Sequence, residues 1–263
     1  MLAITYPSEK RLRLLVNLLI IYTYIITSFL MSYFLTNQHL KTSLFYCSVI
    51  LVAVLFASLA EHSQKNGVLH RLFMFISFSV LFFIYGFRNF SAIDDPSYIR
   101  IFELVSHDGF FEYFKYSTME PGYLILNYIV SLFTNNYFYL QIITSFIPLF
   151  LFYYGFDKLK KIISLPTAVF LLCSMLYFQM LAVSLVRMFI AMGIVFVALC
   201  YIPKRRPVKY VFLIFIATMF HYSSFFMIIL AYFAINKKNL NEKATKLYTI
   251  TFFVSPLLFI LIG

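Results

Sequence analysis

One apolar run constrains the fold of this chain more than any other feature of its sequence. Residues 166–202 contain a single charged side chain, Arg187, in 37 positions. As one straight helix the run would be about 55 Å long, nearly twice the roughly 30 Å thickness of the hydrocarbon core of a bilayer. The run is therefore predicted to fold back as two membrane spans, 166–182 and 185–202.

Similar apolar stretches recur along the chain, at 14–35, 43–60, 71–87, 137–156 and 246–262. Only 12% of the residues are charged, about half the share found in soluble domains. The first stretch is too long for a signal peptide and is interpreted as a retained span. We predict the all-α class: one integral membrane domain, 1–263, forming a polytopic transmembrane helical bundle of about eight spans or half-spans.

The distribution of charge predicts the topology. Cytoplasmic loops of membrane proteins are enriched in Lys and Arg, so the net charge of +11 indicates basic cytoplasmic loops rather than nucleic-acid binding. Segment 88–121 holds six of the ten acidic residues and is predicted to be extracytoplasmic. The N-terminus is predicted to be cytoplasmic, as are the basic clusters at 65–71, 158–161, 204–209 and 237–246.

This topology requires two segments that enter the membrane without a simple crossing. Residues 122–134 are predicted to form an interfacial or re-entrant half-helix. Residues 210–235 are predicted to form a re-entrant hairpin with His221 near its tip. Irregular backbone at membrane depth is tolerated where it is buried in protein or lines a wet cavity, so the hairpin indicates a site. The sequence ends at Gly263 directly after an apolar segment, which is expected either of a naturally short chain or of a truncated one.

Six ionisable residues are predicted to converge on the outer face, and each also has a purely structural explanation. The acids can cap helices that begin at Pro96 and Pro121. The first arginine can anchor a span end, the second can extend to the membrane surface, and the histidine can be a hydrogen-bonded part of the hairpin. The six are Arg88, Asp94, Asp95, Glu120, Arg187 and His221.

The residue types in this set favour sugar-phosphate chemistry. Arginine binds phosphate oxygens through two parallel hydrogen bonds, so Arg88 and Arg187 are predicted to bind a substrate pyrophosphate. The acids and His221 are the candidate catalytic bases toward a sugar hydroxyl. The sequence has no phosphate-binding glycine loop, and its three cysteines lie in apolar segments without metal-ligand spacing.

Three stretches resemble the EpsG-like, Wzy-type bacterial polysaccharide polymerases: "FRNFSAIDDPSYIRIF", "MEPGYLILNYIVSLFTNNYFYLQIITSFI" and "LVRMFIAMGIVFVALCYIPKRRPVKYVFLIFIATMFHYSSFF". The family pattern has an arginine before an acid and a tyrosine, a Glu-Pro-Gly-Tyr motif, an Arg-x-x-Ile-Ala motif and an Ala-x-x-x-His-x-Ser element. The chain departs from it at Met188, where the family usually has Gln, and at Tyr222, where Pro is common. The residues that match the pattern are Arg88, Asp94 or Asp95, Tyr98, Glu120 to Tyr123, Asn127, Arg187, Ile190, Ala191, Ala217, His221 and Ser223.

The resemblance implies a membrane glycosyltransferase of capsule, exopolysaccharide or O-antigen synthesis in the bacterial cytoplasmic membrane. Its substrate would be a lipid-linked oligosaccharide, its leaving group undecaprenyl pyrophosphate, and it would need no metal. Membrane lipids, a flippase and a chain-length regulator are the expected partners. Three alternatives stay open: a flippase or transporter of lipid-linked sugars, a membrane O-acyltransferase, and a ligase that transfers finished glycan.

Overall fold

The computed structural model describes residues 37–88, 93–174 and 182–231, with side chains from residue 45 onward. Within these ranges every regular element is a helix, so the predicted all-α class is confirmed. Three described helices are long and apolar enough to cross a membrane: α2 (Asn37–His62), α3 (Gly67–Gly86) and α7 (Tyr137–Leu159). They match the spans predicted at 43–60, 71–87 and 137–156. The spans predicted at 14–35 and 246–262 lie outside the described residues.

Asparagine side chains cap the first turn of two of the membrane helices. The side chain of Asn66 accepts hydrogen bonds from the backbone N–H groups of Val68 at 3.1 Å and Leu69 at 3.3 Å, which starts α3. Asn136 does the same for Phe138 at the start of α7, at 2.9 Å. These contacts satisfy donors that have no partner within the helix.

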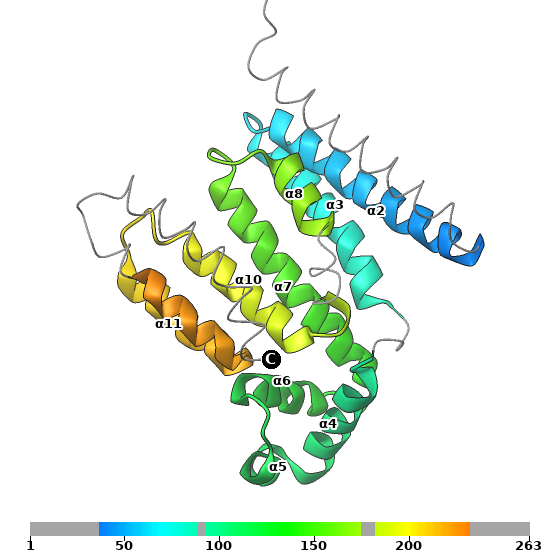
Figure 1. Ribbon diagram of the computed structural model, residues 1–263, viewed down its shortest axis with the longest axis vertical. Helices are drawn as coiled ribbons and strands as arrows, with labels where there is room; N and C mark the ends of the chain where they lie inside the picture. The colour runs from blue at the N-terminus through cyan, green and yellow to red at the C-terminus, as the bar shows by residue number, and fades with distance from the viewer. Residues whose placement is uncertain (1–36, 89–92, 175–181, 232–263) are drawn as a thin grey trace, which may run out of the picture.

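The long apolar run folds back, as predicted. It contains α8 (Leu165–Ser174) and α10 (Val186–Leu199), which run in opposite directions (Figure 1). The backbone N–H of Leu165 donates to Glu61 at the end of α2, at 2.6 Å. The thiol of Cys200, just after α10, lies at that same end, 3.9 Å from the Gly155 carbonyl oxygen. The last residues of α8 and the first turn of α10 therefore lie toward the other end of the bundle.

The predicted hairpin is also present. Helix α11 (Pro207–Phe220) ends at His221, whose backbone is extended, and the 3₁₀ helix η1 (Tyr222–Leu230) returns along it. The Tyr210 hydroxyl, near the start of α11, donates to the carbonyl of Met227 at 2.5 Å, which fastens the returning segment to α11. His221 lies at the turn itself, so the reversal presents the imidazole at the end of the bundle.

Segment 88–121 is largely helical rather than an irregular loop. It contains α4 (Asp95–Asp108) and α5 (Phe110–Tyr116), separated by Gly109 in a left-handed conformation with φ of +81°. Together with α6 (Pro121–Ser131) these helices lie across one end of the bundle and form what we call the helical cap (Figure 1). At 1.5 Å per residue α6 is only about 16 Å long, so it is a half-helix, as predicted.

Basic residues gather at the end of the bundle opposite the helical cap. The connection after α2 meets the connection after α7 there, where the side chain of Gln64 donates to the Lys160 carbonyl at 3.2 Å. The connection after α10 lies at the same end (Figure 1). Because basic loops stay on the cytoplasmic side, this arrangement favours a cytoplasmic basic end. Its residues include Lys65, Lys158, Lys160, Lys161, Lys204, Arg205 and Arg206.

Cysteine labelling is expected to place the two ends on opposite sides of the membrane. In a variant without native cysteines, a cysteine replacing Phe111 of α5, which is 79% exposed, should react with an impermeant maleimide in intact cells. A cysteine replacing Arg205 or Lys237 should react only after permeabilisation; Lys237 lies outside the described residues. Labelling at 111 and 205 from the same side would contradict the topology.

A buried histidine ties three helices together near the basic end. His70 of α3 is fully buried; Nδ1 lies 2.8 Å from the Ala60 carbonyl oxygen in α2, and Nε2 lies 3.0 Å from Asp157 Oδ1 in α7. The Ala60 carbonyl and the Asp157 carboxylate each offer the imidazole a hydrogen-bond acceptor. Lys160 also pairs with Asp157, at 2.7 Å.

The His70→Ala variant is expected to lower the free energy of unfolding by about 2 kcal/mol, because it removes two hydrogen bonds and half of a largely buried ion pair. Thermal unfolding in detergent can be followed with a thiol-reactive dye, since Cys173 and Cys200 are buried. The control is His62→Ala, which removes an exposed histidine from the end of α2. Equal unfolding temperatures for the two variants would show that the buried pair does not stabilise the bundle.

Candidate active site

A buried carboxylate joins three distant parts of the chain beneath the helical cap. Glu120, just before α6, is 4% exposed. Its Oε2 atom accepts a hydrogen bond from Nη1 of Arg187 in the first turn of α10. Its Oε1 atom lies 3.2 Å from Nδ1 of His221 at the hairpin turn. We call these three residues the Glu120 cluster.

The backbone before α6 lets Glu120 contact both partners. The residue is extended, with φ −63° and ψ 135°, and Pro121 starts the helix immediately after it. Glu120 thus occupies the N-cap position, but its side chain makes no capping hydrogen bond. Helix capping therefore does not explain why an acid stands at this position. Its carboxylate instead contacts Arg187 and His221. The Arg187 guanidinium likewise has an anionic partner at the site, so membrane snorkelling is not needed to explain it.

The Glu120 carboxylate is charged at neutral pH. Burial raises the pKa of Glu120, but the hydrogen bond from His221 and the charge of Arg187 outweigh burial and hold this pKa below the ordinary value. Since a carboxylate only accepts hydrogen bonds, His221 donates through Nδ1, and Nε2 of the neutral imidazole is left as a proton acceptor. A depressed carboxyl pKa means that the pairing is present at neutral pH and is lost as the pH falls through that depressed pKa.

Tyr98 of α4 adds a phenol to this cluster. It is 4% exposed, and its ring lies edge-to-face with Tyr123, with the ring centres 5.5 Å apart. Burial raises the pKa of Tyr98, and the nearby Arg187 guanidinium opposes this only in part, so the phenol is neutral. Tyr98 therefore brings the cap helix α4 next to the arginine of α10.

Arg88 and Asp95 form a second, separate ion pair at the same end of the bundle. Nη2 of Arg88 lies 3.2 Å from Oδ1 of Asp95, which is fully buried, and 2.9 Å from the carbonyl of Val183. Nη1 donates to the Tyr85 carbonyl at 2.7 Å. Arg88 is therefore not a simple interfacial anchor, because it connects the end of α3 with α4 and with the segment before α10.

Asp94 occupies the N-cap position of α4 but makes no capping hydrogen bond. Within the described part of the chain its carboxylate has no hydrogen-bond or ion-pair partner. It is half-buried and close enough for its charge to act on Tyr98. Asp94 is therefore placed between the solvent and the tyrosine that contacts Arg187.

All six predicted site residues thus lie at the capped end, in two ion-paired groups with Asp94 beside them. Tyrosines connect the groups: Tyr137 is within electrostatic range of Arg88, Asp95 and Tyr98, and Tyr98 contacts Arg187. The convergence predicted from the sequence is present in the structure, and the roles of the six residues stay a prediction. The sequence did not indicate which acid pairs with which arginine.

A glycine holds α6 close to the end of α11. A Cβ atom at Gly122 would lie 2.8 Å from the carbonyl oxygen of Met219 and 3.0 Å from its carbonyl carbon. Both are backbone atoms, which cannot rotate away as a side chain can. Because Glu120 and His221 each lie two residues from this contact, the close approach sets the distance between them.

The Gly122→Ala variant is therefore expected to reduce activity about tenfold, because small displacements of catalytic groups are costly. No chemical group of the site is removed. The measurement is the length distribution of the polysaccharide whose synthesis the family resemblance implies, and the control is Gly67→Ala at the basic end, where a new Cβ meets no atom within 4 Å. Wild-type chain lengths from the Gly122 variant would show that this contact does not position Glu120.

Two polar residues of this region were not singled out as site residues from the sequence. Tyr98 was noted only within the family pattern. Gln141 in α7 is fully buried and donates to the carbonyls of Gly86 at 2.9 Å and Arg88 at 3.0 Å. The sequence did contain a signal for Gln141: an amide near the start of an apolar membrane helix needs a hydrogen-bond partner, which predicts a buried polar contact there.

Apolar helices with basic loops at one end, and a buried ionic site beneath a helical cap at the other, define a polytopic membrane protein with a site near one membrane face. The chain belongs to the EpsG family, whose sequence model matches residues 71–263. The match includes the helical cap, the Glu120 cluster and the hairpin, and it confirms the family indicated by the motifs. It indicates a polymerase-type, glycosyltransferase-like role in exopolysaccharide synthesis. No curated protein and no solved structure matches the chain.

Proposed function

We propose that the protein is a polymerase that joins oligosaccharide repeat units carried on undecaprenyl pyrophosphate, during synthesis of capsule, exopolysaccharide or O-antigen. The reaction takes place on the outer face of the bacterial cytoplasmic membrane. The observation that carries this proposal is the Glu120 cluster, which combines a guanidinium, a carboxylate and an imidazole at the end of the bundle opposite the basic loops.

In the proposed step, a hydroxyl oxygen of the acceptor repeat unit attacks the anomeric carbon of the growing glycan. The bond from that carbon to the pyrophosphate oxygen breaks, and undecaprenyl pyrophosphate leaves with the electron pair. Nε2 of His221 takes the hydroxyl proton. Glu120 orients the imidazole through Nδ1 and stabilises the imidazolium that forms, as a carboxylate does in other carboxylate–histidine pairs.

Arg187 is proposed to bind the pyrophosphate and to stabilise its charge as it leaves. A guanidinium has five N–H donors. Among the described residues, the buried Nε–H of Arg187 has no acceptor, so this side chain has hydrogen-bonding capacity beyond its contact with Glu120. Electrostatic stabilisation of a developing charge is often the largest single contribution to catalysis.

Arg88 and Asp95 are proposed to position the pyrophosphate site rather than to react. The contacts of the Arg88 guanidinium with Asp95, Tyr85 and Val183 hold α4, and hence Tyr98, against α10. Asp94 is the second candidate for the base, because its half-buried carboxylate has no partner in the described ranges and lies near Tyr98.

The location of the charges favours a polymerase over the alternative of a flippase or transporter. Transporters bind their substrates near the bilayer midplane, between repeated halves. Here the ion pairs that join different helices lie toward the two ends of the bundle. An O-acyltransferase would take its acyl donor from the cytoplasmic side, whereas the Glu120 cluster lies at the capped end.

The test is complementation of a strain from which the chromosomal copy of this protein has been deleted. Without it, single repeat units should accumulate on undecaprenyl pyrophosphate in the outer leaflet, and the protein supplied from a plasmid should restore long glycans. Accumulation in the inner leaflet would instead indicate a flippase. Long glycans that lack only acyl groups would indicate an acyltransferase. Long glycans that stay on the lipid carrier would indicate a ligase.

A further inference from the structure

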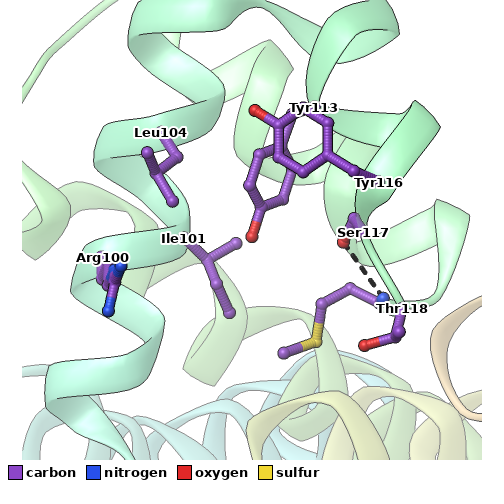
Figure 2. A pocket seen from close by; sticks show the side chains of 8 residues that line it. Arg100, Ile101, Leu104, Tyr113, Tyr116, Ser117 and Thr118 are labelled. Carbon is purple, nitrogen blue, oxygen red and sulfur yellow. Dashed lines mark hydrogen bonds between the residues drawn. The ribbon is translucent and has the colours of Figure 1, made fainter.

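The helical cap contains a cavity that the proposed chemistry does not use. It has a volume of about 300 Å³ and lies between α4 on one side and α5 with the segment after it on the other (Figure 2). Its size is at the lower end of the range for small-molecule pockets. The lining includes Arg100, Tyr113, Tyr116, Ser117 and Thr118.

The lining is rich in groups that bind sugars. Two tyrosines contribute aromatic surface and phenol oxygens, and Ser117 and Thr118 contribute hydroxyls. The Tyr116 hydroxyl donates to Asp108 Oδ2 at 2.6 Å, which raises the pKa of Tyr116 to about 12. The phenol is therefore neutral at physiological pH. Ile101, Leu104 and Met119 complete the lining, so a sugar that enters the cavity meets rings and hydroxyls on part of the wall and aliphatic side chains on the rest.

The charge at the cavity comes from Arg100. In the described part of the chain this exposed guanidinium has no ion-pair partner. The basic side chain of α5 is already paired, Lys115 with Glu112 at 2.7 Å, and Asp108 of α4 contacts Tyr116 and His107. The N–H donors along the edge of a guanidinium bind a carboxylate through two parallel hydrogen bonds. An arginine without an ion-pair partner beside sugar-binding groups therefore favours a carboxylated sugar as the ligand.

The position of the cavity favours a glycan over a lipid pyrophosphate. Met119 belongs to its lining and directly precedes Glu120, so the cavity adjoins the Glu120 cluster. Its α5 wall lies on the side of the cap away from the membrane helices (Figure 1). A pyrophosphate attached to a lipid is restricted to the bundle side, near Arg187, whereas the sugars of a repeat unit extend outward.

We propose that this cavity binds an acidic sugar of the acceptor repeat unit, with Arg100 contacting its carboxylate. The inference rests on the proposed function, because it assigns the cavity to the acceptor of the same reaction. It names a substrate class: repeat units that contain a uronic acid or another carboxylated sugar. Arg100 then determines which repeat units are accepted, and it takes no part in the chemical step.

Binding to the intact protein in lipid nanodiscs tests the proposal without requiring activity. The probes are a hyaluronan tetrasaccharide, which carries carboxylates, and the same tetrasaccharide with its carboxyl groups reduced to alcohols. We expect the carboxylated probe to bind about tenfold more tightly, the effect of one charge-assisted hydrogen-bonded pair. Arg100→Gln should abolish the difference. Lys115→Gln removes the same charge from α5 outside the cavity and should preserve it.

Three other binding outcomes overturn the proposal, and a fourth result separates it from the proposed function. Equal binding of the two probes by the wild-type protein, or no binding of either, excludes an acidic-sugar site without recourse to any variant. A preference that survives Arg100→Gln places the carboxylate elsewhere. Competition by inorganic pyrophosphate that disappears in the Arg100 variant would assign the cavity to the lipid pyrophosphate. Failure of the complementation test with normal probe binding would remove the polymerase proposal and leave the sugar site standing.

Discussion

Replacing His221 by asparagine is expected to lower the rate of polymerisation about 10²–10⁴-fold, the usual contribution of a general base. The asparagine amide can still donate a hydrogen bond toward Glu120, so the ion-paired arrangement is largely preserved. It has no basic nitrogen to take the proton of the acceptor hydroxyl. The measurement is the rate at which single lipid-linked repeat units are converted to longer glycans in membranes that contain equal amounts of protein.

His107→Asn is the matched control for this variant. His107 lies at the end of α4, with its side chain 89% exposed, and contacts only Asp108 in the described part of the chain. The control should polymerise at the wild-type rate. A folded His221→Asn protein with at least a tenth of wild-type activity would exclude the imidazole as the base. The Asp94→Asn variant would then be expected to show the large loss instead.

The Arg187→Ala variant is expected to lower the rate about 10²–10³-fold, by analogy with the loss of one donor that stabilises a developing charge. Arg187→Lys keeps the positive charge but loses the planar pair of donors, so it should recover only part of the activity. Cells with either variant should accumulate single repeat units on lipid. The extent is measured by separating lipid-linked species according to glycan length.

Arg71→Ala is the control for loss of an arginine from a membrane helix. Arg71 lies near the basic end of α3 and donates to the carbonyl of Gly67, far along the helix from the helical cap. Its loss should leave chain length unchanged. Normal long glycans from a stable Arg187→Ala protein would refute the pyrophosphate role. Equal activities of the Lys and Ala variants would show that the positive charge alone contributes nothing.

The hairpin shows how far charge and hydropathy carry a prediction. Three basic clusters had to lie on one side of the membrane, and this forced the segment around His221 to turn back. The structure contains that turn, fastened by the contact of Tyr210 with Met227. The turn was predictable because cytoplasmic loops are enriched in Lys and Arg whatever the details of packing. The third basic cluster, 237–246, lies outside the described residues, so its side of the membrane stays a prediction. The internal structure of 88–121 was not predicted, since α4 and α5 are short cap helices that pack on the rest of the cap.

The partners of the ionisable residues show where prediction ended. Unpaired charges in or beside apolar segments are costly, so the sequence predicted that Arg88, Glu120 and Arg187 each have an ionic partner or a ligand. It did not show that Glu120 pairs with Arg187, or that Asp95 is already occupied by Arg88. Those partners come from α6, α10, α3 and α4, and they depend on how each helix is rotated and how closely it packs.

The sequence by itself determined the all-helical membrane class, the fold-back of the long apolar run, the hairpin at His221 and the family. All of these follow from local hydropathy, charge placement and short motifs. Only the tertiary structure decided which carboxylate joins the arginine to the imidazole, that Gly122 brings α6 against α11, and that Arg100 is among the residues lining a cavity in the helical cap. Each of these contacts joins segments that belong to different helices or connections. Close packing fixes their distances to within a few tenths of an ångström, and a linear pattern of residues does not contain those distances.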